Sequence, residues 1–86
     1  MNIEFEWDPD KAETNRKKHG VSFETACRVF ADPFALAQQD GIEGGEYRWQ
    51  TLGMVEGYLL LIVAHTLRDD DKTEIIRIIS ARRANR

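Results

Sequence analysis

The sequence feature that most constrains the fold is the apolar run YLLLIVAHTL at residues 58–67. The run is apolar at both alternating sets of positions, which is typical of a central strand that is covered on both faces. A polar hairpin loop at residues 68–71 separates it from an isoleucine-rich final strand at residues 72–80. Another strand is predicted at residues 47–54, followed by a turn at residues 55–57. Together these segments predict an antiparallel meander.

A strand and a surface helix are predicted before the meander. Residues 2–7 alternate between apolar and acidic side chains, which predicts a short edge strand with one buried face. Asp8 and Pro9 suit the N-cap and the first helical position, so we expect a helix over residues 9–19. Gly20 is suited to end this helix. Because the helix has few apolar residues, it should lie on the surface.

A second helix is expected from Ser22 to Asp32, because Ser22 can cap its first turn and the residue before Pro33 avoids the helical region. Residues 34–38 predict a short strand, and the acidic, glycine-rich residues 40–46 predict a loop. The predicted order is a strand, two helices and an antiparallel meander. Such an order packs the helices against one face of a curved sheet, which is the α+β class.

Length and composition point to one soluble domain over residues 1–86. The single Cys27 excludes an internal disulfide framework, and no signal-peptide pattern opens the sequence. No apolar run is long enough to span a bilayer. One cysteine and two distant histidines do not predict a metal site, and no cofactor-binding motif such as a glycine-rich phosphate loop is present. We therefore expect a cytoplasmic protein with no metal, no cofactor and no membrane partner.

Charge is segregated along the chain, although the formal net charge is only −3. Acids crowd residues 4–10, 40–46 and 69–71, whereas residues 75–86 carry four arginines and no acid. These are Arg77, Arg82, Arg83 and Arg86. A basic cluster can act apart from the total charge, because salt screens charges beyond roughly 8–10 Å. The arginine cluster is therefore either a solvated strand end or a site for an anion, above all a polyanion.

Arg77 lies within the final predicted strand, where alternation assigns side chains to faces. One face is predicted to hold Ile75, Arg77 and Ile79, and the other Glu74, Ile76, Ile78 and Ser80. An arginine among isoleucines is costly unless its head reaches water, an acid or a ligand. Arg77 is therefore either paired with an acid or aimed into an anion site. Arg68 opens the predicted hairpin loop, where the three aspartates that follow it could neutralise it.

Acid–base groups beside an arginine would allow proton transfer at a bound phosphate. His65 is the best acid–base candidate, because its unperturbed pKa near 6.5 suits proton transfer; a buried, structural histidine is the alternative. Glu46 either pairs with Arg48, two residues away on the same strand face, or acts as the general base. The first helix ends with Lys17, Lys18 and His19, which could extend a phosphate-binding surface if that end borders the sheet.

A series of short motifs runs through the chain in a fixed order. They are FEWDP at residues 5–9, KHGVSF at 18–23, VF and DP within 29–33, EYRW at 46–49, Gly53, HT at 65–66 with Arg68, and RIISARRA at 77–84. This series resembles the BrnT toxins of bacterial type II toxin–antitoxin systems, and the likeness covers nearly the whole chain. Family members usually continue beyond the last motif into a further charged helix, whereas this sequence stops at Arg86. A C-terminal helix is therefore expected to be missing.

The resemblance implies a fold similar to the RelE-type ribonuclease toxins and an RNA-cleaving activity that arrests translation. RNA cleavage by attack of the 2′ hydroxyl, without a metal, needs a base, a cation and an acid. It also implies a BrnA-type antitoxin partner with a ribbon-helix-helix part, through which the complex binds operator DNA. On the residues and the resemblance together, we expect an endoribonuclease whose catalytic candidates are His65, Arg68, Arg77, Arg82 and Glu46. The RNA-binding candidates are Arg48, Arg83, Lys18 and His19. We expect His65, Arg77 and Arg82 to line one cleft, and a degenerate homologue that binds the antitoxin or RNA without cleavage is the alternative.

Overall fold

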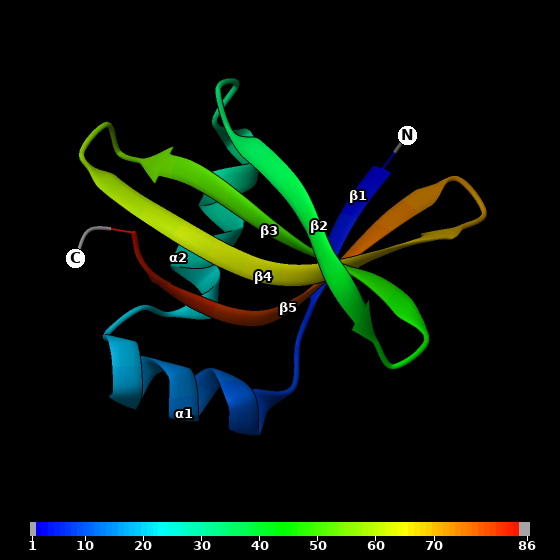
Figure 1. Cartoon of the computed structure of the whole chain (residues 1–86), viewed down its shortest axis with the longest axis horizontal. Coiled ribbons are helices and arrows are strands. Elements are labelled where there is room, and N and C mark those ends of the chain that lie inside the picture. The colour runs from blue at the N-terminus through cyan, green and yellow to red at the C-terminus, as the bar shows by residue number, and fades with distance from the viewer. Residues whose placement is uncertain (1, 85–86) are drawn as a thin grey trace.

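The computed structural model describes residues 2–84, whose strands form one five-stranded sheet in the order β1-β5-β4-β3-β2 (Figure 1). The strands are β1 (Asn2–Glu6), β2 (Leu36–Glu43), β3 (Glu46–Val55), β4 (Leu59–Asp70) and β5 (Thr73–Arg83). Strands β2 to β5 form an antiparallel meander, and β1 is added to β5 in parallel. The predicted α+β class is confirmed, and β1 is an edge strand as expected. Arg86 lies outside the described residues.

The first helix, α1 (Pro9–His19), begins and ends where its sequence predicts. The Asp8 side chain accepts a hydrogen bond of 2.8 Å from the backbone N–H of Asp10, which caps the first turn. Gly20 ends the helix in the left-handed conformation, with φ of 73°. α1 lies along β5 and buries only Asn15 (Figure 1). No helix among residues 2–84 has both the length and the apolar character needed to cross a membrane.

Asn15 fixes α1 against the sheet. β1 pairs with β5 only as far as Arg77, so the edge of β5 beyond it has no neighbouring strand. The Asn15 side chain occupies that edge: its Nδ2 donates to the carbonyl of Ala81 at 2.8 Å, and its Oδ1 accepts from the N–H of Ala81 at 3.1 Å. Nδ2 also donates to the carbonyl of Val21 at 3.0 Å. One side chain thus satisfies three backbone groups that burial would otherwise leave unpaired.

The second predicted helix is divided into a short α2 (Phe23–Cys27) and a 3-10 turn, η1 (Arg28–Ala31). Both lie against one face of the sheet, where the core forms (Figure 1). Gly53 of β3 allows this close approach, because a Cβ there would lie 2.6 Å from Cγ1 of Val29. We call the opposite face of the sheet, which these helices leave free, the uncovered face. It carries the alternate positions of β3 and β4, such as Arg48 and Thr66.

The predicted loop at residues 40–46 is wrong for its first part. β2 continues to Glu43, beyond the predicted end of the strand, and only Gly44 and Gly45 form the turn into β3. Their positive φ values, 57° and 83°, suit a tight two-residue hairpin turn that glycine adopts without strain. The register of β2 shifts between Gln39 and Gly41, so the strand passes the acidic segment through a bulge.

The predicted faces of β5 are wrong beyond Ile78. The register with β4 shifts at the Ala64–His65 step, which leaves Ile79 as an extra residue in a bulge. Ser80 therefore lies opposite Ala64 on the uncovered face, and not on the same face as Ile78. A bulge of one residue reverses the alternation for the rest of a strand, and this is why Ser80 and Arg82 share the uncovered face with Arg77.

We expect Asn15→Ala to lower the free energy of unfolding by about 2–4 kcal/mol, because it leaves buried groups of Ala81 and Val21 without partners. Urea denaturation of the wild type and the variant measures this difference. Thr14→Ala is the matched control, since Thr14 is exposed on the same turn of α1; it should change stability by less than about 0.5 kcal/mol. Equal stability of the two variants would contradict the role given to Asn15.

Candidate nucleic-acid interface

A row of aligned side chains crosses four strands on the uncovered face. Arg48 of β3 lies opposite Thr66 of β4. Arg77 of β5 lies opposite Thr66 from the other side, and Glu6 of β1 lies opposite Arg77. Thr66 is only 2% exposed although no helix covers this face. The row therefore brings arginines from β3 and β5 to either side of β4.

Glu6 holds two arginines of this face at once. Its carboxylate accepts hydrogen bonds of 2.8 and 3.2 Å from Arg68, and another of 3.1 Å from Arg77. The hydrogen bonds from Arg68 are the largest cause of a lowered pKa of Glu6; Arg77 adds to it, and desolvation opposes it. Of the two alternatives for Arg77, the structure has the pairing with an acid. Arg68 lies within β4 and pairs with Glu6 instead of the aspartates that follow it.

Arg48 is also paired, but not with the predicted acid. Its Nη1 lies 3.1 Å from Oε1 of Glu43, and its Nε lies 3.5 Å from Oδ1 of Asp40. The predicted Glu46–Arg48 pair is therefore wrong, because the longer β2 brings its own acids beside Arg48. The charge of Glu46 acts instead on Arg68, whose pKa is raised chiefly by the hydrogen bonds to Glu6.

Arg82 and Arg83 lie near the end of β5 and are both exposed. Arg82 lies opposite Ile62 on the uncovered face, whereas Arg83 lies opposite Leu61 and lines a hollow with Gly20 at the end of α1. The two arginines thus lie on different faces. Within residues 2–84, no carboxylate lies within 4.0 Å of either guanidinium group.

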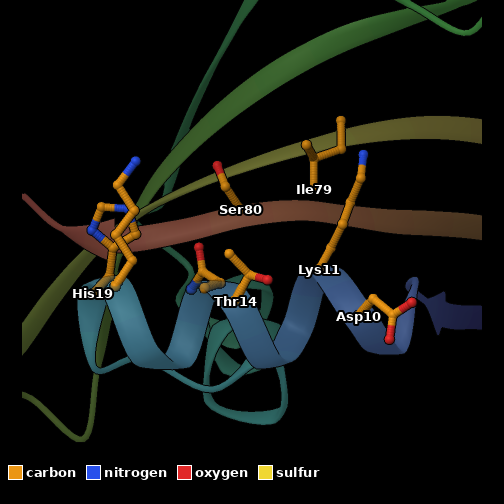
Figure 2. A pocket seen from close by; sticks show the side chains of 8 residues that line it. Asp10, Lys11, Thr14, His19, Ile79 and Ser80 are labelled. Carbon is orange, nitrogen blue, oxygen red and sulfur yellow. The ribbon is translucent and has the colours of Figure 1, made fainter.

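A groove of about 320 Å³ runs between α1 and the edge of β5. It is lined by Asp10, Lys11, Thr14, Asn15, Lys18, His19, Ile79 and Ser80. Figure 2 shows Lys11 and His19 toward its two ends, with Ser80 between them. Lys11 and Lys18 are two helical turns apart and hence on one side of α1, and neither is in an ion pair among the described residues. The end of α1 therefore does border the sheet, with three basic side chains against one acid.

His65 lies in the core, on the face of β4 opposite to the arginines. It is 2% exposed, its Nε2 lies 2.7 Å from the hydroxyl of Thr51, and its ring packs edge-on against Phe30 with centroids 4.8 Å apart. Burial lowers its pKa below 6.5, and its hydrogen bond with the carbonyl of Thr66 opposes this only in part. The prediction that His65 shares a cleft with Arg77 and Arg82 is wrong, because alternation along β4 points His65 away from them.

Comparison with known proteins identifies the family of the chain. Residues 7–86 match the family model described as the ribonuclease toxin, BrnT, of type II toxin–antitoxin systems. The chain belongs to the BrnT family. A solved structure, the ribonuclease toxin BrnT of Brucella abortus, matches over 100% of both chains with a TM-score of 0.65 and 20% identity. That likeness shows a shared fold. A comparison with curated proteins gives no match.

Two of the short motifs quoted from the sequence contribute residues to the groove of this BrnT chain. The KHG motif ends α1 and brings Lys18 and His19 to it, and the C-terminal motif contributes Ile79 and Ser80. Sequence reasoning missed Lys11 and Glu6. The spacing of seven residues between Lys11 and Lys18 predicts that both lie on one side of α1. For Glu6, the alternation of β1 predicts a side chain that points away from the core.

The buried imidazole should make stability depend on pH. The unfolded chain protonates His65 below about pH 6.5, whereas the folded chain does so only at its lower pKa. The contribution of His65 to the free energy of unfolding is therefore full above pH 6.5 and falls as the pH drops below it. Between about pH 7 and about pH 5.5, we expect a loss of about 1 kcal/mol in the wild type.

Urea denaturation at the two pH values measures this loss. His65→Gln should be less stable overall but should lack most of the decline, because glutamine does not titrate. His19→Gln is the matched control and should keep the decline, since His19 is not buried in the core. A decline that persists in His65→Gln would contradict the assignment to His65.

Proposed function

We propose that this BrnT chain is an endoribonuclease toxin that binds RNA in the groove between α1 and β5. The observation that carries the proposal is that some basic side chains form ion pairs with acids of the chain, whereas those that line the groove do not. Arg48, Arg68 and Arg77 are neutralised by acids of the chain itself. Lys11 and Lys18, which line the groove, have no such partner among the described residues and can meet phosphates.

Arg82 extends this binding surface along β5. It follows Ser80 on the uncovered face, two residues further along the strand, and its guanidinium group is exposed. A guanidinium can donate two parallel hydrogen bonds to a phosphate, and it stays charged throughout the reaction. Arg77 and Arg68, held in direction by Glu6, are proposed to border the RNA path on the same face. Arg83 lies on the other face and is proposed to contact RNA only beyond the groove.

The proposed reaction is attack of the 2′ oxygen on the adjacent phosphorus, with cleavage of the bond to the 5′ oxygen. Arg82 and Lys18 stabilise the charge that develops on the phosphoryl oxygens. His19 replaces His65 as the acid–base group, because it is the imidazole that lines the groove. A base takes the 2′ proton and an acid returns a proton to the leaving 5′ oxygen, so protons balance over the reaction. Glu46 lies beside Arg68, near the opposite end of the sheet from the groove, so it is proposed to act on RNA only there, and a water molecule in the groove serves the second of these two roles.

The family description supports the biological setting of the proposal. Its members are described as ribonuclease toxins of type II toxin–antitoxin systems, so an antitoxin partner belongs to the system. We propose that RNA cleavage by this chain inhibits translation, and that a BrnA-type antitoxin neutralises it. Binding to operator DNA is proposed to occur only through that antitoxin.

Lys18→Ala should lower the rate of RNA cleavage by the purified chain about tenfold, since it removes a phosphate contact. Arg82→Ala should lower the rate about a hundredfold, the usual cost of one donor to a transition-state oxyanion. Lys17→Ala is the matched control: Lys17 neighbours Lys18 but pairs with Glu13 at 3.7 Å and is not in the groove. It should stay within about twofold of the wild type.

Induction of each variant in cells should arrest growth in the order of the cleavage rates, most strongly for Lys17→Ala and least for Arg82→Ala. Urea denaturation shows that each variant still folds. Equal loss of activity in Lys17→Ala and Lys18→Ala would contradict the groove as the RNA site. A folded wild type that binds RNA without cleaving it would contradict the enzymatic proposal and favour a non-catalytic binding protein.

His19→Gln tests the acid–base role separately. We expect a loss of about a hundredfold or more in the rate, together with loss of one limb of the pH–rate profile. RNA binding, measured without turnover, should change much less. A profile of unchanged shape in this variant would exclude His19 as the acid–base group.

A further inference from the structure

The uncovered face has a second half that the proposed RNA site does not use. Leu36 of β2 lies opposite Leu52 of β3, and Leu52 lies opposite Ile62 of β4. Ile62 in turn lies opposite Arg82 of β5. We call this region, with its neighbours, the apolar patch; its members are Phe34, Leu36, Leu52, Met54, Leu60 and Ile62.

The patch is exposed and hollowed. Phe34 is 86% exposed and Leu36 69%, high values for such large apolar side chains. Two adjoining hollows of about 500 and 410 Å³ lie over the patch and share Leu36 and Leu52 as walls. Contiguous apolar surface with hollows on a small chain is typical of a site for another protein.

The charges around the patch indicate what chemistry its partner has. Asp32 is occupied by the backbone N–H groups of Phe34 and Met54, at 2.9 and 2.8 Å. Asp40 is occupied by Arg48 and by Gln50, whose amide donates to it at 2.7 Å. Arg82 is therefore the charge at the border of the patch that has no partner among the described residues. A complementary surface is apolar and carries a carboxylate.

We propose that the antitoxin docks on the apolar patch through a segment with apolar side chains and an acidic residue that pairs with Arg82. A second copy of this chain fits less well, because a symmetric dimer through the patch would bring together two copies of Arg82, while the described acids of the patch, Asp32 and Asp40, are already occupied. The consequence for inhibition rests on the proposed function. An antitoxin carboxylate paired with Arg82 would occupy the guanidinium group that binds the RNA phosphate. Docking of the antitoxin beside the groove would therefore prevent RNA binding.

Leu36→Asp tests the docking surface. The probe is the purified cognate antitoxin, and the dissociation constant is measured by calorimetry in the absence of RNA. We expect Leu36→Asp to weaken binding about thirtyfold, which corresponds to loss of an interface anchor. Ile42→Asp is the matched control: Ile42 lies on the same strand, is also 69% exposed and lies outside the patch. It should bind within about threefold of the wild type.

Phe34→Asp gives a second measurement at the other end of the patch and should weaken binding to a similar degree. Wild-type affinity in both patch variants would overturn the proposal, and so would equal weakening by Ile42→Asp. Light scattering of the chain alone tests whether a second copy of the chain occupies the patch. A wild-type dimer that Leu36→Asp converts to a monomer would also overturn the docking proposal.

RNA cleavage by Leu36→Asp, assayed without antitoxin, separates this proposal from the proposed function. If the docking proposal is right, the Leu36→Asp variant cleaves RNA at the wild-type rate, and added antitoxin no longer inhibits it at the concentrations that inhibit the wild type. An active Leu36→Asp variant that the antitoxin still inhibits at wild-type concentrations overturns the docking proposal and leaves the ribonuclease standing. A wild type without cleavage overturns the proposed function, whereas the calorimetric result on docking is unaffected.

Discussion

The hydrogen bonds between the Asn15 amide and the backbone of Ala81 are the interaction on which the rest of the site depends. α1 has almost no apolar residues with which to bury itself, so packing alone would hold it weakly. The amide gives it a fixed position, because both its oxygen and its nitrogen pair with one residue of β5. That position sets the width of the groove between the basic residues of α1 and Ser80. The same contact closes an edge of the sheet that other chains could otherwise pair with.

Ion pairs decide which basic side chains of this molecule are neutralised, and they therefore shape its surface charge more than the net charge does. The acids of β1 and β2 lie beside Arg48, Arg68 and Arg77 and neutralise them. Among residues 2–84, several cations without such partners lie on α1 and at the end of β5. An acidic chain can therefore present a basic surface to a polyanion, since screening confines each charge to its neighbourhood.

Much of the fold could be predicted from the sequence, because its local signals agree with each other. Asp8, Pro9 and Gly20 mark α1 at both ends, and the apolar runs mark the central strands. The site was less predictable. The bulge at Ile79 leaves no trace in composition or alternation, yet it decides the face on which Arg82 lies. His65 follows an apolar run on both faces, so only the register with β3 and β5 determines that it points into the core.

The contact between α1 and β5 determines when the groove can form during synthesis. The groove joins residues of α1, near the start, to Ile79 and Ser80, near the end of the described chain. During synthesis, α1 leaves the ribosome long before β5 exists, and it has no partner on the sheet until then. The proposed RNA site therefore cannot assemble on a nascent chain that lacks β5. β5 must therefore leave the ribosome before the groove can form.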